Sequence, residues 1–172
     1  MSEASEDVVE YWLSSMDYFT MRNRKVRRNK EIDFLAITLG KPDGRLGSRT
    51  HIEVHVGAFS RAIKSRSDRP VWPPSAYAER LVRSKFEDPD VVGEVIKMLG
   101  EDYRRVAVWG SYGRTRPDRE AREELFKELE KRGITVVRFE ELVREVEKKI
   151  GTGMHSNPAI RMIQYYKYMQ EW

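Results

Sequence analysis

Alternation of apolar and polar side chains is clearest in two short segments. Residues 31–37 read Glu-Ile-Asp-Phe-Leu-Ala-Ile, and residues 51–56 read His-Ile-Glu-Val-His-Val. Successive side chains of a strand point to opposite faces, so Glu53 shares its face with His51 and His55, while valine and isoleucine occupy the other. The pattern predicts two strands, each carrying one carboxylate among apolar neighbours.

The polar break between these segments predicts how the strands pair. Lys41-Pro42-Asp43-Gly44-Arg45 is typical of a three-residue hairpin loop, because proline presets the first turn position and glycine supplies the left-handed residue. With the two ends of this loop paired, Asp33 lies opposite Glu53, and such residues have Cβ atoms roughly 4.5–5.5 Å apart. A one-residue slip would send the two acids to opposite faces.

Two carboxylates at that distance repel each other unless a cation lies between them. Carboxylate oxygens are hard ligands that suit magnesium or manganese. The sequence therefore predicts a site for Mg²⁺ or Mn²⁺ at Asp33 and Glu53.

Longer apolar repeats predict helices, and short apolar runs predict further strands. The helices are expected over residues 6–13, 75–85, 88–99, 118–132, 140–150 and 158–172, and the strands over residues 105–109 and 134–139. This alternation indicates an α/β fold whose sheet is extended by a C-terminal strand and helix. We expect one domain over residues 1–150, followed by a linker and an aromatic amphipathic helix over residues 151–172.

Composition narrows the class of protein. A chain of 172 residues is long enough for one well-packed α/β domain, and the absence of cysteine excludes disulfides and thiolate chemistry. No apolar run approaches the ~18 residues of a membrane span, and the N-terminal segment is acidic and polar. We therefore expect a cytoplasmic protein with no membrane partner. The arginine-rich composition, with 35% charged residues, is typical of a thermophile.

Basic residues lie on both sides of the two carboxylates. The net charge is +4 and the isoelectric point is about 9.3. One group precedes the Asp33 strand and comprises Arg22, Arg24, Lys25, Arg27, Arg28 and Lys30; the other follows the Glu53 strand and comprises Arg61, Lys64, Arg66 and Arg69. This distribution favours DNA as the partner, since the groups would draw phosphates toward the acids. The alternative is a solvated basic edge strand protected from aggregation.

These residues together resemble the PD-(D/E)XK, or restriction-endonuclease-like, nuclease superfamily, most nearly its archaeal Holliday-junction resolvase and Mrr-like branches. The resemblance covers residues 5–110. It is carried by Glu-Ile-Asp over residues 31–33, by Ile-Glu-Val-X-Val over residues 52–56, and by an acidic helix before them. Glu6 matches the helix glutamate of the family better than Glu10, which lies one turn further along the same face.

The resemblance implies an α-β-β-β-α-β core, with a mixed central sheet flanked by helices. It also implies a divalent-metal-dependent DNA endonuclease acting on phosphodiester bonds, with branched or structured DNA as a family-level expectation. Asp33 and Glu53 would hold the metal, the Val54 carbonyl would complete its shell, and Glu6 would assist from the helix.

One position departs from the family pattern. The family places a lysine two residues after the strand glutamate, where this chain has His55. A neutral imidazole is able to act as a general base or to orient water near pH 7, although it supplies no permanent charge. Lys64 is a substitute if the chain folds back toward the site.

The missing lysine leaves two further interpretations open. One is a catalytically decayed nuclease fold that serves as a nucleic-acid-binding or assembly module. The other is a structural α/β domain whose acids are solvated surface groups.

The C-terminal helix also has several candidate roles. Ile160, Ile163, Tyr166 and Met169 recur at helical spacing. Such a helix packs on its own domain, joins two subunits as a homodimer, or stacks on bases.

Overall fold

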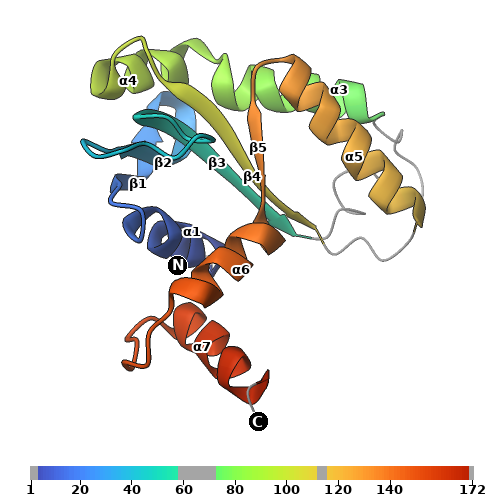
Figure 1. Cartoon of the computed structure of the whole chain (residues 1–172). Coiled ribbons are helices and arrows are strands. Elements are labelled where there is room, and N and C mark those ends of the chain that lie inside the picture. Colours follow the sequence, from blue (N-terminus) through green and yellow to red (C-terminus); the bar gives the residue numbers. More distant parts are fainter. Residues whose placement is uncertain (1–3, 58–72, 112–115, 171–172) are drawn as a thin grey trace.

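The computed structural model describes residues 4–57, 73–111 and 116–170 (Figure 1). The predicted basic residues Arg61, Lys64, Arg66 and Arg69 lie outside the described residues. The elements in chain order are α1 (Ala4–Ser14), β1 (Phe19–Val26), the 3₁₀ turn η1 (Arg27–Asn29), β2 (Lys30–Ile37), β3 (Arg49–Gly57), α3 (Pro74–Leu81), the π-helical turn η2 (Val82–Phe86), α4 (Pro89–Leu99), β4 (Arg104–Ser111), α5 (Arg116–Lys131), β5 (Thr135–Arg138), α6 (Phe139–Lys149) and α7 (Pro158–Gln170).

The strands form one open mixed sheet in the order β1-β2-β3-β4-β5. The β1–β2 and β2–β3 pairs are antiparallel, whereas β3–β4 and β4–β5 are parallel. The parallel pairs need crossovers, which α3, η2 and α4 supply before β4 and α5 supplies before β5. The expected α/β class, mixed sheet and C-terminal extension are confirmed.

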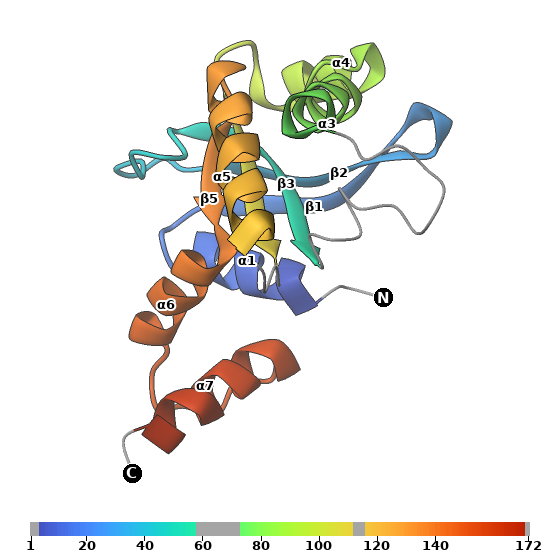
Figure 2. The same ribbon diagram turned by 90° about the vertical axis from the view of Figure 1, so that its right-hand side faces the viewer.

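Helices cover both faces of the sheet (Figures 1 and 2). On one face α1, α6 and α7 pack through Trp12, Leu142 and Ile160. On the other face α3, η2 and α5 cover β4, while α4 packs on β2 through Val91 and Val95. None of the helices in the described ranges has the length and apolar character needed to cross a bilayer.

The pairing of β2 with β3 has the predicted register but a different connection. Leu35 pairs with His51 and Phe34 with Ile52, as expected. However, the strands end at Ile37 and begin at Arg49, so residues 38–48 form the connection and the predicted three-residue loop is wrong.

Packing explains why this connection is longer. Leu46 is fully buried in the core beneath it, and the Tyr18 hydroxyl donates to the Gly47 carbonyl at 2.6 Å. The left-handed residue is Gly47, with φ 69°, rather than Gly44. Anchoring Leu46 in the core draws the chain away from a tight turn.

Alanine substitutions at two glycines test how closely the helices pack. A Cβ atom at Gly110 in β4 would lie 2.7 Å from the Phe139 Cβ, whereas one at Gly93 in α4 would meet nothing within 4 Å. We expect Gly110→Ala to lower the free energy of unfolding by about 1–3 kcal/mol, because α6 must shift. Gly93→Ala, the matched control, should raise it by about 0.5–1 kcal/mol through helix propensity. Urea unfolding monitored by circular dichroism measures both, and equal effects would contradict the close β4–α6 contact.

Candidate functional site

The two predicted acids lie where strands β2 and β3 separate. Pairing between these strands runs from Ile37 with Arg49 to Phe34 with Ile52. Beyond that point β2 stays with β1 as a hairpin, while β3 continues along β4 to Gly57. Figure 2 shows the β1–β2 hairpin and the end of β3 diverging. Asp33 and Glu53 are the next residues on each strand, so they stand at the vertex of this fork.

The backbone around Asp33 is irregular on both sides. The Asp33 Oδ2 accepts a hydrogen bond from the Val54 N–H at 2.7 Å, which satisfies a backbone donor at the fork. On the β1 side, Asn23 adopts a left-handed conformation with φ 52° between two paired positions. Ile32 and Leu35 pack in the same cluster against α4, so the two-residue alternation of β2 slips at Asp33. The β1–β2 pairs keep the same register on both sides of this break, so an unpaired position opposite Asn23, with no inserted residue, sets the position of this carboxylate.

Glu53 is fully buried and has two partners. His51 Nε2 lies 3.0 Å from Glu53 Oε1, and Lys85 Nζ lies 2.6 Å from Oε2. Because an ionised carboxylate only accepts, the His51 Nε2 carries the proton in this contact. The ammonium lies off the direction that a hydrogen bond requires, since Oε2 has no hydrogen-bond partner among the described residues. Oε2 is therefore engaged by the charge of Lys85 at 2.6 Å, without a well-directed hydrogen bond.

Lys85 is the site residue that the sequence did not reveal. It lies in the π-helical turn η2, and its neighbour Phe86 is fully buried against the His51 ring, with centroids 4.9 Å apart. Wide turns of this kind change the direction of the following side chains and are frequent at functional sites. No local signal could have identified Lys85, because only the docking of a distant helix brings it to Glu53.

Burial and mutual charge set the ionisation of this cluster. Burial, followed by the negative charge of Glu53, raises the pKa of Asp33 to about 7. Burial opposes the ionisation of Glu53, but the hydrogen bond from His51 and the charge of Lys85 outweigh it and lower the Glu53 pKa. Burial would lower the pKa of Lys85, yet the charge of Glu53 raises it. Glu53 and Lys85 are therefore an ion pair at neutral pH, whereas Asp33 titrates near neutral pH.

His55 shares the face of His51 and Glu53, and the charges of Glu53 and Lys85 both act on it. Its ring lies 5.0 Å from that of Trp109, and its buried Nε2 has no hydrogen-bond partner among the described residues. Burial lowers the pKa of His55 to about 4. The imidazole is neutral at pH 7 and is a weak proton acceptor, which argues against the role of general base.

Glu6 belongs to an acidic cluster held by one arginine. Arg22 binds Glu6 at 3.0 Å, Asp7 at 2.8 Å and Glu10 at 2.8 Å. The side chain of Glu6 is 16% exposed and that of Glu10 is 41% exposed, and the charge of Glu6 contributes to the raised pKa of Asp33. This contribution of Glu6 is small, since it follows burial, Glu53, the Val54 hydrogen bond and Lys85 in size.

The basic residues of the β1–β2 hairpin divide into two sets. Arg24 is paired with Glu94, and Lys30 with Asp88 and Asp90. Toward the tip, Lys25, Arg27 and Arg28 are exposed, and the nearest carboxylate to Arg28 is that of Asp90 at 3.9 Å. The three tip residues are therefore available to an anionic partner.

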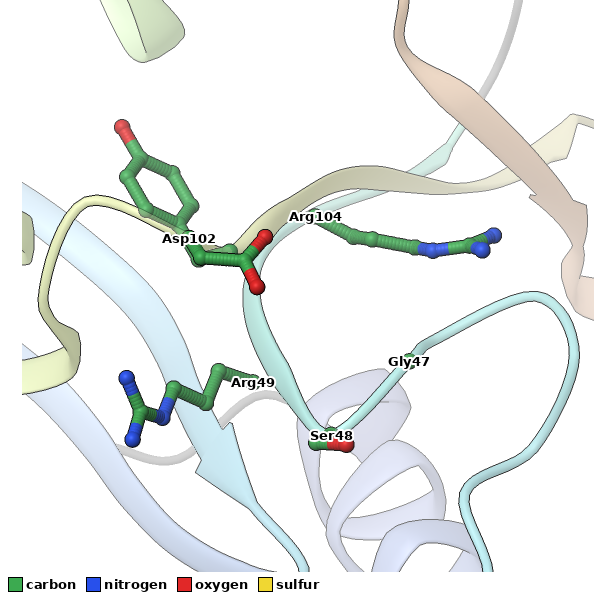
Figure 3. A pocket seen from close by; sticks show the side chains of 6 residues that line it. Gly47, Ser48, Arg49, Asp102 and Arg104 are labelled. Atoms are coloured by element: carbon green, nitrogen blue, oxygen red, sulfur yellow. The ribbon is translucent and has the colours of Figure 1, made fainter.

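A separate hollow of about 420 Å³ lies where β3 and β4 begin (Figure 3). The guanidinium groups of Arg49 and Arg104 point away from each other there and donate to the carbonyls of Leu99 and Gly44. The carboxylate of Asp102 lies between them. None of the predicted site residues lines this hollow.

The oxygen donors at the fork suit a hard cation that takes only one or two of its ligands from the protein. Within the described ranges, no three or more His, Asp or Glu side chains are grouped so as to hold a metal ion. Magnesium is commonly bound through one or two carboxylates with water and substrate phosphates. The repelling pair Asp33 and Glu53 supplies two such carboxylates, although the Lys85 ammonium already lies against Glu53 Oε2.

Comparison with known proteins identified no relative, since no family model, curated protein or solved structure matches the chain.

The raised pKa of Asp33 predicts how stability changes with pH. Between pH 4 and 7 Asp33 ionises in the unfolded chain before it ionises in the folded one, so the contribution of Asp33 to the stability of the metal-free protein falls as the pH rises. Asp33→Asn keeps an acceptor for the Val54 N–H and removes this loss. We expect the variant to be more stable at pH 8, by on the order of 2–4 kcal/mol, and equal to wild type near pH 4.

Chemical denaturation in the presence of a chelator measures this difference. Asp88→Asn is a useful contrast, because the neighbouring Lys30 lowers the pKa of Asp88 and its replacement should cost stability at neutral pH. A pH-independent effect of Asp33→Asn would contradict the proposed burial and repulsion.

Proposed function

We propose that this chain is a Mg²⁺- or Mn²⁺-dependent endonuclease that hydrolyses phosphodiester bonds in DNA. The observation that carries the proposal is the fork itself, where Asp33 and Glu53 stand together with the ammonium of Lys85. A fully buried glutamate and a carboxyl group of raised pKa are costly in a purely structural role. The order of helix, three antiparallel strands, crossover helices and parallel strand supports the resemblance to PD-(D/E)XK nucleases.

Asp33 and Glu53 would hold the cation, with the Val54 carbonyl and Glu6 as further oxygen donors. When bound, the cation would polarise the phosphoryl oxygens and lower the pKa of the attacking water. His51 fixes the Glu53 carboxylate through Oε1, which leaves Oε2 beside the Lys85 ammonium. The Val54 N–H holds Asp33 in the same manner.

Lys85 would supply the positive charge that the sequence lacks at position 55. Its ammonium reaches Glu53 from the helical layer, and its raised pKa keeps it protonated at neutral pH. A permanently charged lysine stabilises negative charge developing on the phosphoryl group and is a poor general base. This assignment makes the substitution of lysine by His55 compatible with activity.

DNA is the proposed substrate because exposed basic residues project beside the fork. Lys25, Arg27 and Arg28 extend beyond Asp33 along the hairpin. The proposal includes branched or structured DNA, on the resemblance to junction resolvases.

A second function is favoured by the same ion pair. Lys85 neutralises Glu53 without a metal, as expected of a decayed nuclease fold that only binds nucleic acid or assembles with other molecules. In that case Lys85 would take the place of a cation rather than act beside one.

Plasmid nicking with added manganese tests the catalytic proposal. We expect Asp33→Ala and Glu53→Ala to abolish cutting, and Lys85→Met to slow it by roughly 100-fold, with partial recovery in Lys85→Arg. Lys97→Met is the matched control, because the Lys97 side chain is 69% exposed on α4 and its nearest carboxylate is that of Glu94 at 3.9 Å.

The thermal response to manganese separates the two functions. A nuclease should gain stability with the metal, and Asp33→Asn should remove that gain. If the wild type neither cuts nor responds to manganese, while Lys85→Met acquires a metal response, the decayed version is correct.

DNA binding without metal tests the basic hairpin. We expect reversal of Lys25, Arg27 and Arg28 to glutamate to weaken binding of a labelled duplex and to reduce the slope of log affinity against log salt by about 2–3 units. The control is the same replacement at three exposed basic residues on or next to α5, namely Lys127, Lys131 and Arg132. Absence of binding by the wild type at low salt would favour a structural domain.

A further inference from the structure

The C-terminal helix α7 has one face on its own domain and one face in solvent. Ile160 is buried against the domain, and the buried Gln164 donates to the carbonyls of Gly151 and Gly153 at 2.8 Å each. Several large apolar side chains on the helix are exposed: Met162 (68%), Tyr165 (55%), Tyr166 (61%) and Met169 (77%). Figure 1 shows α7 at the end of the molecule remote from α4 and the β1–β2 hairpin.

A groove of about 760 Å³ lies between α6 and α7. Phe139 and Val143 from α6 line it together with Met162, Ile163 and Tyr166 from α7. An exposed apolar groove of this size, rimmed by charge, is typical of a protein interaction site.

The rim of the groove carries both signs of charge on α6. The rim residues are Glu140, Arg144, Glu147 and Lys148. In the part of the chain that the structure describes, Glu140 reaches Arg122 at 3.4 Å, and no ion pair is formed by Arg144, Glu147 or Lys148. These charges balance one another, which disfavours a nucleic acid or an anionic membrane as the occupant.

We infer that a second copy of this chain occupies the groove, in a two-fold symmetric dimer. A two-fold axis brings the same patch of both copies together, so each residue must complement another residue of its own patch. Arg144 and Glu147 lie one turn apart on one helix, and an axis passing between them sets Arg144 of each copy against Glu147 of the other. The apolar floor supplies the buried area, and Tyr166 and Met162 cover each other across the axis.

Two neighbouring tyrosines give a matched test of this interface. Tyr165 and Tyr166 are similarly exposed on α7, but only Tyr166 lines the groove. Sedimentation equilibrium of the full chain should show a dimer for the wild type and for Tyr165→Glu. For Tyr166→Glu, the dissociation constant of the dimer should rise by roughly 10-fold or more. A monomeric wild type at about 100 μM, or equal effects of the two variants, would overturn the inference.

A charge swap tests the symmetry. Arg144→Glu and Glu147→Arg should each weaken the dimer, because each sets like charges against each other twice. The double variant restores opposite charges and should recover most of the wild-type affinity. Circular dichroism confirms that each variant is folded, and failure of the double variant to recover would exclude this two-fold arrangement.

Discussion

Repulsion between two carboxylates at the point where β2 leaves β3 is the constraint on which the candidate site depends. A continuous ladder would place Asp33 and Glu53 face to face, with their two charges directly opposed. The β2–β3 pairing instead ends at Phe34 and Ile52. The alternation of side chains along β2 is broken at Asp33, and the residue opposite it on β1 is the left-handed Asn23. The Asp33 carboxylate then satisfies the Val54 N–H that the ladder no longer serves. The irregular backbone and the charge pair are therefore parts of one arrangement.

The two faces of the sheet contribute differently to this arrangement. The face of α3 and η2 delivers Lys85 to Glu53 and encloses His51 beside Phe86, so that the glutamate stays ionised although it is fully buried. The opposite face carries α1, whose acids are gathered by Arg22. Local charge balance on the first face leaves Asp33 as the carboxylate of raised pKa, and a ligand cation would bind there in competition with a proton.

Much of the architecture follows from sequence periodicity, whereas the chemistry of the site follows only in part. The alternation at residues 31–37 and 51–56 predicted the strands and their register, because a slip would expose an entire apolar face. The three-residue turn predicted from the Pro-Asp-Gly segment was wrong, since the burial of Leu46 outweighs local turn preference. The contact of Lys85 with Glu53 could not be predicted from the sequence, because a contact between distant elements has no local pattern. The low pKa of His55 likewise follows from its burial in the folded chain, where the β3–β4 pairing brings Trp109 beside it.

Glu145 on α6 accepts hydrogen bonds from both Trp12 on α1 and Arg45 in the β2–β3 connection. One carboxylate thus ties the first elements of the chain to one of the last. The antiparallel half of the sheet has mostly local contacts and is able to form early, but this closure requires α6 to be in place. Unfolding of the molecule should consequently be all-or-none, because neither half keeps its hydrogen-bond partners when the other is lost.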